Sequence, residues 1–180
     1  MKRALVVVSL FAASCGLMKR VPNTFYTLDT IPGAAAATNI AGTPIGIDGI
    51  ELPPGLDRRE VTARQSDNKL DVRGHHQWAS PLEDMVTHTL SFNLASRLPE
   101  GMVVLPGQVK PGAMRSLYVT FEDLAPGPDN VFVLDARWTM GELTRHERIT
   151  VPLTSNDSAA VVAAMSQALG QLSDRIVAAL

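Results

Sequence analysis

Alternation between apolar and polar residues over 116–153 constrains the fold of this chain more than any other pattern in its sequence. Between Val131 and Met140, apolar side chains occupy every second position, which is typical of a strand with one buried face. The stretch Ser116–Glu122 alternates in the same way, and a turn at Gly141 closes a hairpin to a third strand over Leu143–Leu153. Charged side chains mark this third strand as an exposed or edge strand. We therefore expect these strands to form the centre of a largely antiparallel sheet.

Two amphipathic segments predict helices. Ser80, Pro81 and Glu83 place a hydroxyl at the cap, a proline at the first helical position and a carboxylate three residues after the cap, which is a capping box. An apolar stripe at spacings of three and four residues follows and ends near residues 99–101. A second stripe predicts a helix over Ser158–Leu180, after a Ser-Asn-Asp cap sequence.

Four shorter stretches predict further strands before the first helix. Thr24–Thr30 alternates, and it has no local partner. Pro44–Leu52 changes the phase of its apolar residues at Asp48, which predicts a bulge or turn there. Glu60–Gln65 and Lys69–Gly74 flank a Ser-Asp-Asn turn and predict a hairpin.

The side chains of this hairpin divide by character. We expect Val61 and Ala63 to share one face, and Leu70 and Val72 to share one face of their own strand. The charged side chains are expected to face water instead: Arg64, Lys69, Asp71 and Arg73.

The length and composition fit one globular domain over residues 24–180. The chain has 180 residues, of which 46% are hydrophobic and 19% charged, which is enough apolar material for a core. Packing both helices on one face of the sheet buries their apolar stripes. The expected fold is an α+β two-layer sandwich, with a largely antiparallel sheet and two amphipathic helices on one face.

The N-terminus predicts export and a lipid anchor. Residues 1–14 combine a basic start with a short apolar run, which is typical of a signal peptide. Cys15 follows two alanines and a serine, as in the lipobox of bacterial lipoproteins, and it is the only cysteine. We expect Cys15 to carry the anchor, with palmitate among its acyl chains, and residues 15–23 to form a short tether of about 35 Å at most. The alternative is an ordinary signal peptide with an incidental cysteine.

No pattern for catalysis or metal binding is present in the sequence. It has no nucleophile elbow, no glycine-rich phosphate loop and no cysteine pair. His75 and His76 are adjacent in a strand, and neither His88 nor His146 has a carboxylate or histidine at metal-binding spacing. We expect no catalytic residue, no metal ion and no cofactor. The formal net charge of −2 also argues against nucleic acid as a partner.

Two features before the first helix point to contacts with a partner or a second subunit. Trp78 lies just before the helix cap, where it can pack on the hairpin and the helix start or serve as a docking residue. Leu56, Asp57 and Arg58 follow a Pro-Pro-Gly turn that does not itself require this triplet. We therefore propose Leu56, Asp57, Arg58 and Trp78 as candidate partner or subunit contacts.

Three fragments together resemble the ABC-type transport auxiliary lipoprotein family. They are YTLD at Tyr26–Asp29, LPPGLDRREVTAR at Leu52–Arg64 and NKLDVRGHHQWASPLED at Asn68–Asp84. The pattern is a proline after a strand, a Leu-Asp-Arg turn, a strand that ends in arginine, and a tryptophan before a Pro-Leu helix start. The chain departs from it in an alanine-rich insertion at residues 33–43 and in Ala12, which replaces the usual lipobox leucine.

The resemblance implies a lipoprotein on the periplasmic face of the outer membrane. Its expected partners are a periplasmic transport protein of the mammalian-cell-entry type, an inner-membrane permease and an ATPase, which together move lipids. The family's pattern carries no catalytic residues. A homo-oligomer stays open, as do two other functions: a lipoprotein chaperone or assembly factor for another envelope complex, and an exported hydrolase with a dispersed site.

Overall fold

The computed structural model describes residues 21–33, 42–65, 69–127 and 129–180. The expected signal peptide, Cys15 and most of the alanine-rich insertion lie outside these residues. Within them, the chain forms eight strands and two helices, which confirms the predicted α+β class. None of the described helices is long and apolar enough to cross a membrane.

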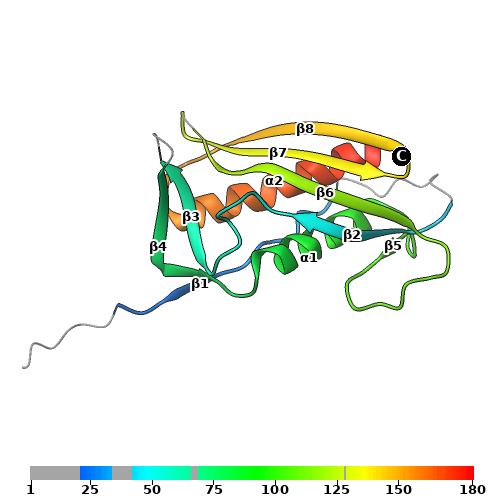
Figure 1. The fold of residues 1–180 in the computed structure, drawn as a ribbon, viewed down its shortest axis with the longest axis horizontal. Helices are drawn as coiled ribbons and strands as arrows, with labels where there is room; N and C mark the ends of the chain where they lie inside the picture. The colour runs from blue at the N-terminus through cyan, green and yellow to red at the C-terminus, as the bar shows by residue number, and fades with distance from the viewer. Residues whose placement is uncertain (1–20, 34–41, 66–68, 128) are drawn as a thin grey trace, which may run out of the picture.

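The larger of two sheets has five strands in the order β5-β2-β6-β7-β8 (Figure 1). These strands span Val103–Val104 (β5), Ile45–Glu51 (β2), Arg115–Pro126 (β6), Val131–Met140 (β7) and Leu143–Pro152 (β8). β6, β7 and β8 are antiparallel, as the alternation predicted, and β8 is an edge strand. β2 runs parallel to both β5 and β6. The predicted bulge in β2 is confirmed, because its register against β6 shifts between Ile47 and Gly49.

A second, three-stranded sheet stands beside the first, where the sequence analysis predicted only one sheet. Its order is β1-β4-β3, with bounds Thr24–Tyr26 (β1), Lys69–Trp78 (β4) and Glu60–Gln65 (β3). The separation follows from the turn after β2. Pro53 and Pro54 cannot donate ladder hydrogen bonds, and Gly55 has a φ of 90°, so the chain leaves the larger sheet there. β1 has a distant partner, as predicted, because it runs parallel to the end of β4.

Both helices cover one face of the five-stranded sheet, as predicted (Figure 1). α1 spans Leu82–Ala95 and α2 spans Ser158–Ala178. The core lies between these two layers, and its largest fully buried side chains include Phe121, Phe132 and Trp138 of β6 and β7. The alternating strands therefore supply the sheet side of the core.

The two helix starts differ. The Asp157 carboxylate caps α2 by accepting a hydrogen bond from the Ala160 N–H at 2.9 Å. The capping box predicted for α1 is wrong, because the helix starts one residue later than that box requires and Pro81 is the cap residue. No side chain accepts a hydrogen bond at this cap, since the proline side chain has no acceptor atom and Ser80 lies before it. The regular part of α1 ends at Ala95, before the predicted end at residues 99–101.

In β4 of the β3–β4 hairpin, the side chains face the opposite way from the prediction: the apolar ones face water, and Arg73 faces inward. Leu70 and Val72 are 42% and 41% exposed, whereas the register places Arg73 opposite the buried Val61. Arg73 therefore faces inward, where its guanidinium donates to Ser158 Oγ at 2.9 Å. A charged group is costly at an inward-facing position unless it is hydrogen-bonded, and this bond to the start of α2 gives the Arg73 guanidinium a partner.

Residues 28–33, here called the strap, run from β1 along the helix layer. Alternate N–H groups of the strap donate to helix side chains: Asp29 to Ser166 Oγ (3.1 Å), Ile31 to Asn93 Oδ1 (2.7 Å) and Gly33 to Ser96 Oγ (3.2 Å). Gly170 of α2 allows this close approach, because a Cβ there would lie 2.8 Å from the Ile31 Cβ. The strap is therefore fastened to both helices.

Arg97, just after α1, completes the attachment and is only 4% exposed. Its guanidinium donates to the carbonyls of Ile31 (2.7 Å), Asn93 (2.9 Å) and Gly170 (3.1 Å), and its Nε donates to Asp174 Oδ1 (2.6 Å). One buried side chain thus joins the strap, α1 and α2.

Candidate docking site

A pocket of about 440 Å³ lies where the turn after β2 meets the end of β4 and the start of α1. This cavity, here called the turn pocket, is lined by Asp57, Arg58, Arg59, Trp78, Ala79, Ser80 and Pro81. Asp57, Arg58 and Trp78 are three of the four contact residues proposed from the sequence. The fold therefore brings residues from two separate stretches of the chain around one cavity.

Backbone hydrogen bonds shape the turn pocket. The Leu56 N–H donates to the Pro53 carbonyl at 3.2 Å, and the Arg58 N–H donates to the Leu56 carbonyl at 2.8 Å. The Trp78 N–H donates to the Arg59 carbonyl at 2.7 Å, which joins this turn to the end of β4. Leu56, the fourth proposed residue, is 6% exposed and does not line the pocket. Its side chain packs in the hydrophobic core beneath the turn.

Trp78 is the aromatic residue in the lining of the turn pocket. It is 6% exposed and belongs to the hydrophobic core. Its register partner is Tyr26 of β1, whose carbonyl accepts a hydrogen bond from the Ala79 N–H at 2.8 Å. An indole held in this way has a fixed orientation, so it can present one edge to a ligand at little cost in conformational entropy.

Two exposed arginines stand at the rim of the turn pocket. The Arg58 Nε lies 3.4 Å from a carboxylate oxygen of Glu60, and both side chains are partly exposed. No carboxylate of the described residues lies within ion-pair distance of Arg59. Exposed ion pairs are weak, so Arg58 can exchange Glu60 for an acceptor on another molecule. The rim also carries one carboxylate, that of Asp57.

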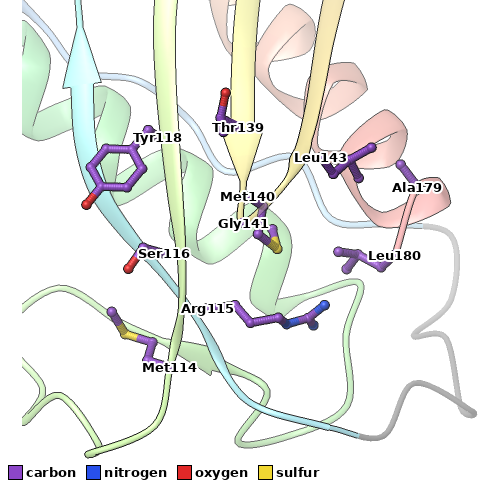
Figure 2. A pocket seen from close by; sticks show the side chains of 10 residues that line it. All are labelled: Met114, Arg115, Ser116, Tyr118, Thr139, Met140, Gly141, Leu143, Ala179 and Leu180. Atoms are coloured by element: carbon purple, nitrogen blue, oxygen red, sulfur yellow. The ribbon is translucent and has the colours of Figure 1, made fainter.

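A second cavity, of about 610 Å³, lies at the C-terminal end of α2, by the tip of the β7–β8 hairpin (Figure 2). This end pocket is lined by Met114, Arg115, Ser116, Tyr118, Thr139, Met140, Gly141, Leu143, Ala179 and Leu180. Arg115 points from β6 toward the end of α2, and Tyr118 lies on the other side of β6 (Figure 2). No pattern in the sequence predicts a site in this region.

A polar cluster on the five-stranded sheet contains Glu122, Asp135 and His146, from β6, β7 and β8. Their ligand atoms lie within 4.8 Å of one another, so the sheet gives His146 two carboxylate neighbours that the local spacing in the sequence did not reveal. The His146 Nε2 lies 2.5 Å from Asp135 Oδ1 and 4.0 Å from Glu122 Oε2. Arg148 and Arg137 bond the other oxygens of these carboxylates, at 2.7 Å and 3.1 Å. Because two arginines already balance two carboxylates, we interpret this cluster as an ion-pair network.

A bulge places Asp123 near this network. The register of β6 against β7 shifts between Phe121 and Asp123, which brings Asp123 opposite Asp135. Burial raises the pKa of Asp123, although Arg64 opposes this shift through a 2.8 Å ion pair. Arg64 belongs to β3, so this pair connects the two sheets.

The sequence of this chain matches known proteins over the region that forms this fold. A sequence model of the ABC-type transport auxiliary lipoprotein component matches residues 26–177, which is most of the chain. The chain belongs to this family. Intermembrane transport lipoprotein PqiC of Escherichia coli (strain K12) is 27% identical over 142 residues, which cover 78% of this chain and 74% of that protein. PqiC of Shigella flexneri matches with the same identity and coverage.

Two solved structures share the fold of this family member. A protein described only as uncharacterized has a TM-score of 0.71 and 21% identity, with 88% of this chain and 98% of that chain covered. Protein XCC0632 from Xanthomonas campestris has a TM-score of 0.60 and 19% identity, with 86% and 92% covered. At these identities the likeness concerns the fold alone.

Two of the structural findings had a signal in the sequence that could have revealed them. The two-residue turn at Gly141 sets the β7–β8 register, which places Arg137 opposite His146 and Asp135 beside it. Arg59 adjoins the proposed Arg58 in the same turn. The end pocket had no such signal, because its lining comes from three separate stretches of the chain.

Proposed function

We propose that this lipoprotein is the auxiliary component of an ABC-type lipid transport system and docks that system at the outer membrane. Its partner in this proposal is a periplasmic transport protein of the mammalian-cell-entry type, which works with an inner-membrane permease and an ATPase. The match of residues 26–177 to the auxiliary lipoprotein family is the observation that carries the proposal. The similarity to PqiC, an intermembrane transport lipoprotein, supports it.

The strap supports a role as an anchored docking protein. A lipidated Cys15 would lie about ten residues before β1, so the domain would stay within about 35 Å of its membrane. The strap follows β1 directly and is bound to both helices through Arg97 and three side-chain acceptors. Tension on the anchor that detached β1 would therefore be resisted at the strap, which is bonded to both helices.

The turn pocket is the proposed docking surface on this domain. It combines a fixed indole, that of Trp78, with two exposed arginines, Arg58 and Arg59. Tryptophan and arginine are the residue types that most often dominate binding energy at protein interfaces. The transport proteins would supply the transport chemistry, and no catalytic step is assigned to this lipoprotein.

The anchor is tested by fractionating cells that express the native chain or a Cys15→Ser variant. We expect the native chain in the outer-membrane fraction and the variant in the soluble periplasmic fraction, because the substitution removes the acylated thiol. Recovery of the variant in the membrane fraction would show that Cys15 is not the anchor.

The partnership is tested by affinity capture from solubilised envelopes, using the native lipoprotein with a C-terminal tag. The expected result is recovery of a mammalian-cell-entry-type protein, followed by the permease and the ATPase. The Cys15→Ser protein serves as the control for contacts that only reflect shared membrane. Recovery of a different envelope complex instead of these proteins would overturn the proposal.

A further inference from the structure

The end pocket has one cationic and one apolar part. Its apolar part is formed by Met140, Leu143, Ala179 and Leu180, which gather between the hairpin tip and the end of α2 (Figure 2). The Arg115 side chain points from β6 toward this group (Figure 2). Leu180 is 36% exposed, so part of this apolar surface is open to water.

Arg115 keeps most of its hydrogen-bonding capacity free in the described part of the chain. Its Nε donates to the Thr43 carbonyl at 3.2 Å, and no described residue accepts a hydrogen bond from either of its terminal nitrogens. No described carboxylate forms an ion pair with it either. A guanidinium has five N–H donors in a planar fork, so Arg115 can still bind an anionic group through two parallel hydrogen bonds.

The nearby helix end does not require Arg115. The last turn of α2 satisfies its own carbonyls in part, since the Ala179 N–H donates to the Ile176 carbonyl and the Leu180 N–H to the Val177 carbonyl. The nearby carboxylate of Asp48 is bonded to Lys110 and Ser116. The structure thus gives the charge of Arg115 no carboxylate partner among the described residues.

We propose that the end pocket binds an anionic amphiphile, with its carboxylate or phosphate head on Arg115 and its alkyl chain over Met140, Leu143, Ala179 and Leu180. The volume of about 610 Å³ falls within the range of about 300–1,000 Å³ that is usual for small-molecule sites. A fully polar anion would leave the apolar part exposed, and a neutral alkane would leave the guanidinium unpaired. Only a ligand with both parts satisfies the whole pocket.

This inference does not depend on the proposed docking role. The end pocket and the turn pocket share no lining residue, so either function can fail while the other stands. A failure to capture a transport protein would therefore leave the amphiphile site intact, and the reverse also holds.

The test is a calorimetric titration of the full chain carrying Cys15→Ser, purified without detergent, with ligands kept below their critical micelle concentrations. The anionic probes are dodecanoate and dodecyl phosphate, which separate a carboxylate head from a phosphate head. The comparison probes are dodecyltrimethylammonium, which reverses the charge, and inorganic phosphate, which lacks the chain. We expect both anionic amphiphiles to bind at one site and the comparison probes to bind at least tenfold more weakly.

Variants separate the two parts of the site. Arg115→Gln should weaken dodecanoate binding by about tenfold or more, because a charge-assisted hydrogen bond is lost, and Arg115→Lys should restore part of it. Leu143→Ser should also weaken binding, whereas Arg145→Gln and Val109→Ser, which lie outside both pockets, should not. Equal binding by Arg115→Gln would overturn the proposal, as would the absence of amphiphile binding. Inorganic phosphate that binds as tightly as dodecyl phosphate would identify a simple anion site instead.

Discussion

Arginines occupy two regions of this lipoprotein in opposite ways. Arg97 in the helix layer is 4% exposed, and its guanidinium bonds three backbone carbonyls and one carboxylate. Arg58 and Arg59 at the turn pocket are exposed, and only Arg58 has a carboxylate of the described residues within ion-pair distance, that of Glu60 at 3.4 Å. In the helix layer the arginine therefore makes its hydrogen bonds within the fold, whereas at the turn pocket the arginines keep donors available for a partner.

The difference separates a structural role from a binding role. A buried, saturated arginine cannot accept a new partner without breaking bonds that hold the strap and both helices together. An exposed arginine beside a fixed indole can form new hydrogen bonds while the fold stays unchanged. We therefore expect substitutions in the helix layer to change stability, and substitutions at the rim of the turn pocket to change partner binding.

The largest loss of stability is expected from Trp78→Ala, which removes the buried floor of the turn pocket. Truncating a buried tryptophan costs about 3–5 kcal/mol of unfolding free energy, measurable by urea denaturation. An unchanged melting temperature together with lost partner binding would instead make Trp78 purely a docking residue.

Arg97→Met should lower the free energy of unfolding by about 2–4 kcal/mol. The substitution keeps an apolar stem but leaves the Ile31 carbonyl without a donor, at about 1–3 kcal/mol, and removes the charged donor of the Asn93 carbonyl, which keeps a hydrogen bond from Ser96 Oγ. Asp174→Asn is the matched control, because the Asp174 side chain is 59% exposed and an asparagine oxygen can still accept from the Arg97 Nε, so a smaller loss is expected. If the control lowers the free energy of unfolding as much as Arg97→Met does, the ion pair with Asp174 would contribute more stability than the hydrogen bond from Arg97 to the strap.

Gly170→Ala tests how closely the strap is fastened. A Cβ at this position would lie 2.8 Å from the Ile31 Cβ, and such overpacking costs about 1–3 kcal/mol. Alanine in a helix regains up to about 1 kcal/mol, so we expect a net loss of about 1 kcal/mol in denaturation experiments. Gly74→Ala, where a Cβ meets nothing within 4 Å, should not show this loss. A more stable Gly170→Ala protein would mean that the strap can lift away.

Asp48 extends the comparison to a carboxylate that, like Arg97, has its hydrogen-bond partners within the fold. Hydrogen bonds from Lys110 and Ser116 hold the pKa of Asp48 below its ordinary value, and this pair joins the bulge of β2 to β6 and the preceding loop. A lowered folded-state pKa stabilises the protein above the unfolded value of about 3.9, and this contribution is lost as pH falls through the folded value. The stability difference from Asp48→Asn should therefore be full at pH 6 and shrink below about pH 4. A difference that is constant with pH would exclude the charge as its cause.

The local patterns of the sequence predicted the strands and helices well, but not how separate segments combine. Alternation identified β7 with its correct bounds, and the apolar stripes identified both helices and the face they cover. Local spacing could not reveal that β4 turns Arg73 inward, because that phase depends on the Ser158 acceptor from α2. The second sheet was missed for a similar reason, since its parallel β1–β4 pair joins segments far apart in the chain.

The candidate site shows the same limit. Asp57 and Arg58 were proposed because no local rule explained them, and Trp78 because of its place just before the helix cap. The fold places all three around one pocket. Leu56 was proposed on the same ground, but its burial follows from packing beneath the turn, which no local pattern encodes. No sequence pattern singled out Arg97, because the carbonyls of Ile31 and Gly170 that it bonds lie far from it in the sequence.

The most direct test of the docking role is affinity capture with the double variant Arg58→Glu/Arg59→Glu, compared with Arg145→Glu on the exposed edge strand. Exposed substitutions of this kind change stability by only about 0.5 kcal/mol, so both proteins should keep their melting temperature and membrane location. We predict that the double variant loses at least tenfold of the captured transport protein, while Arg145→Glu captures as much as the native chain. Equal capture by the double variant would contradict docking through the turn pocket.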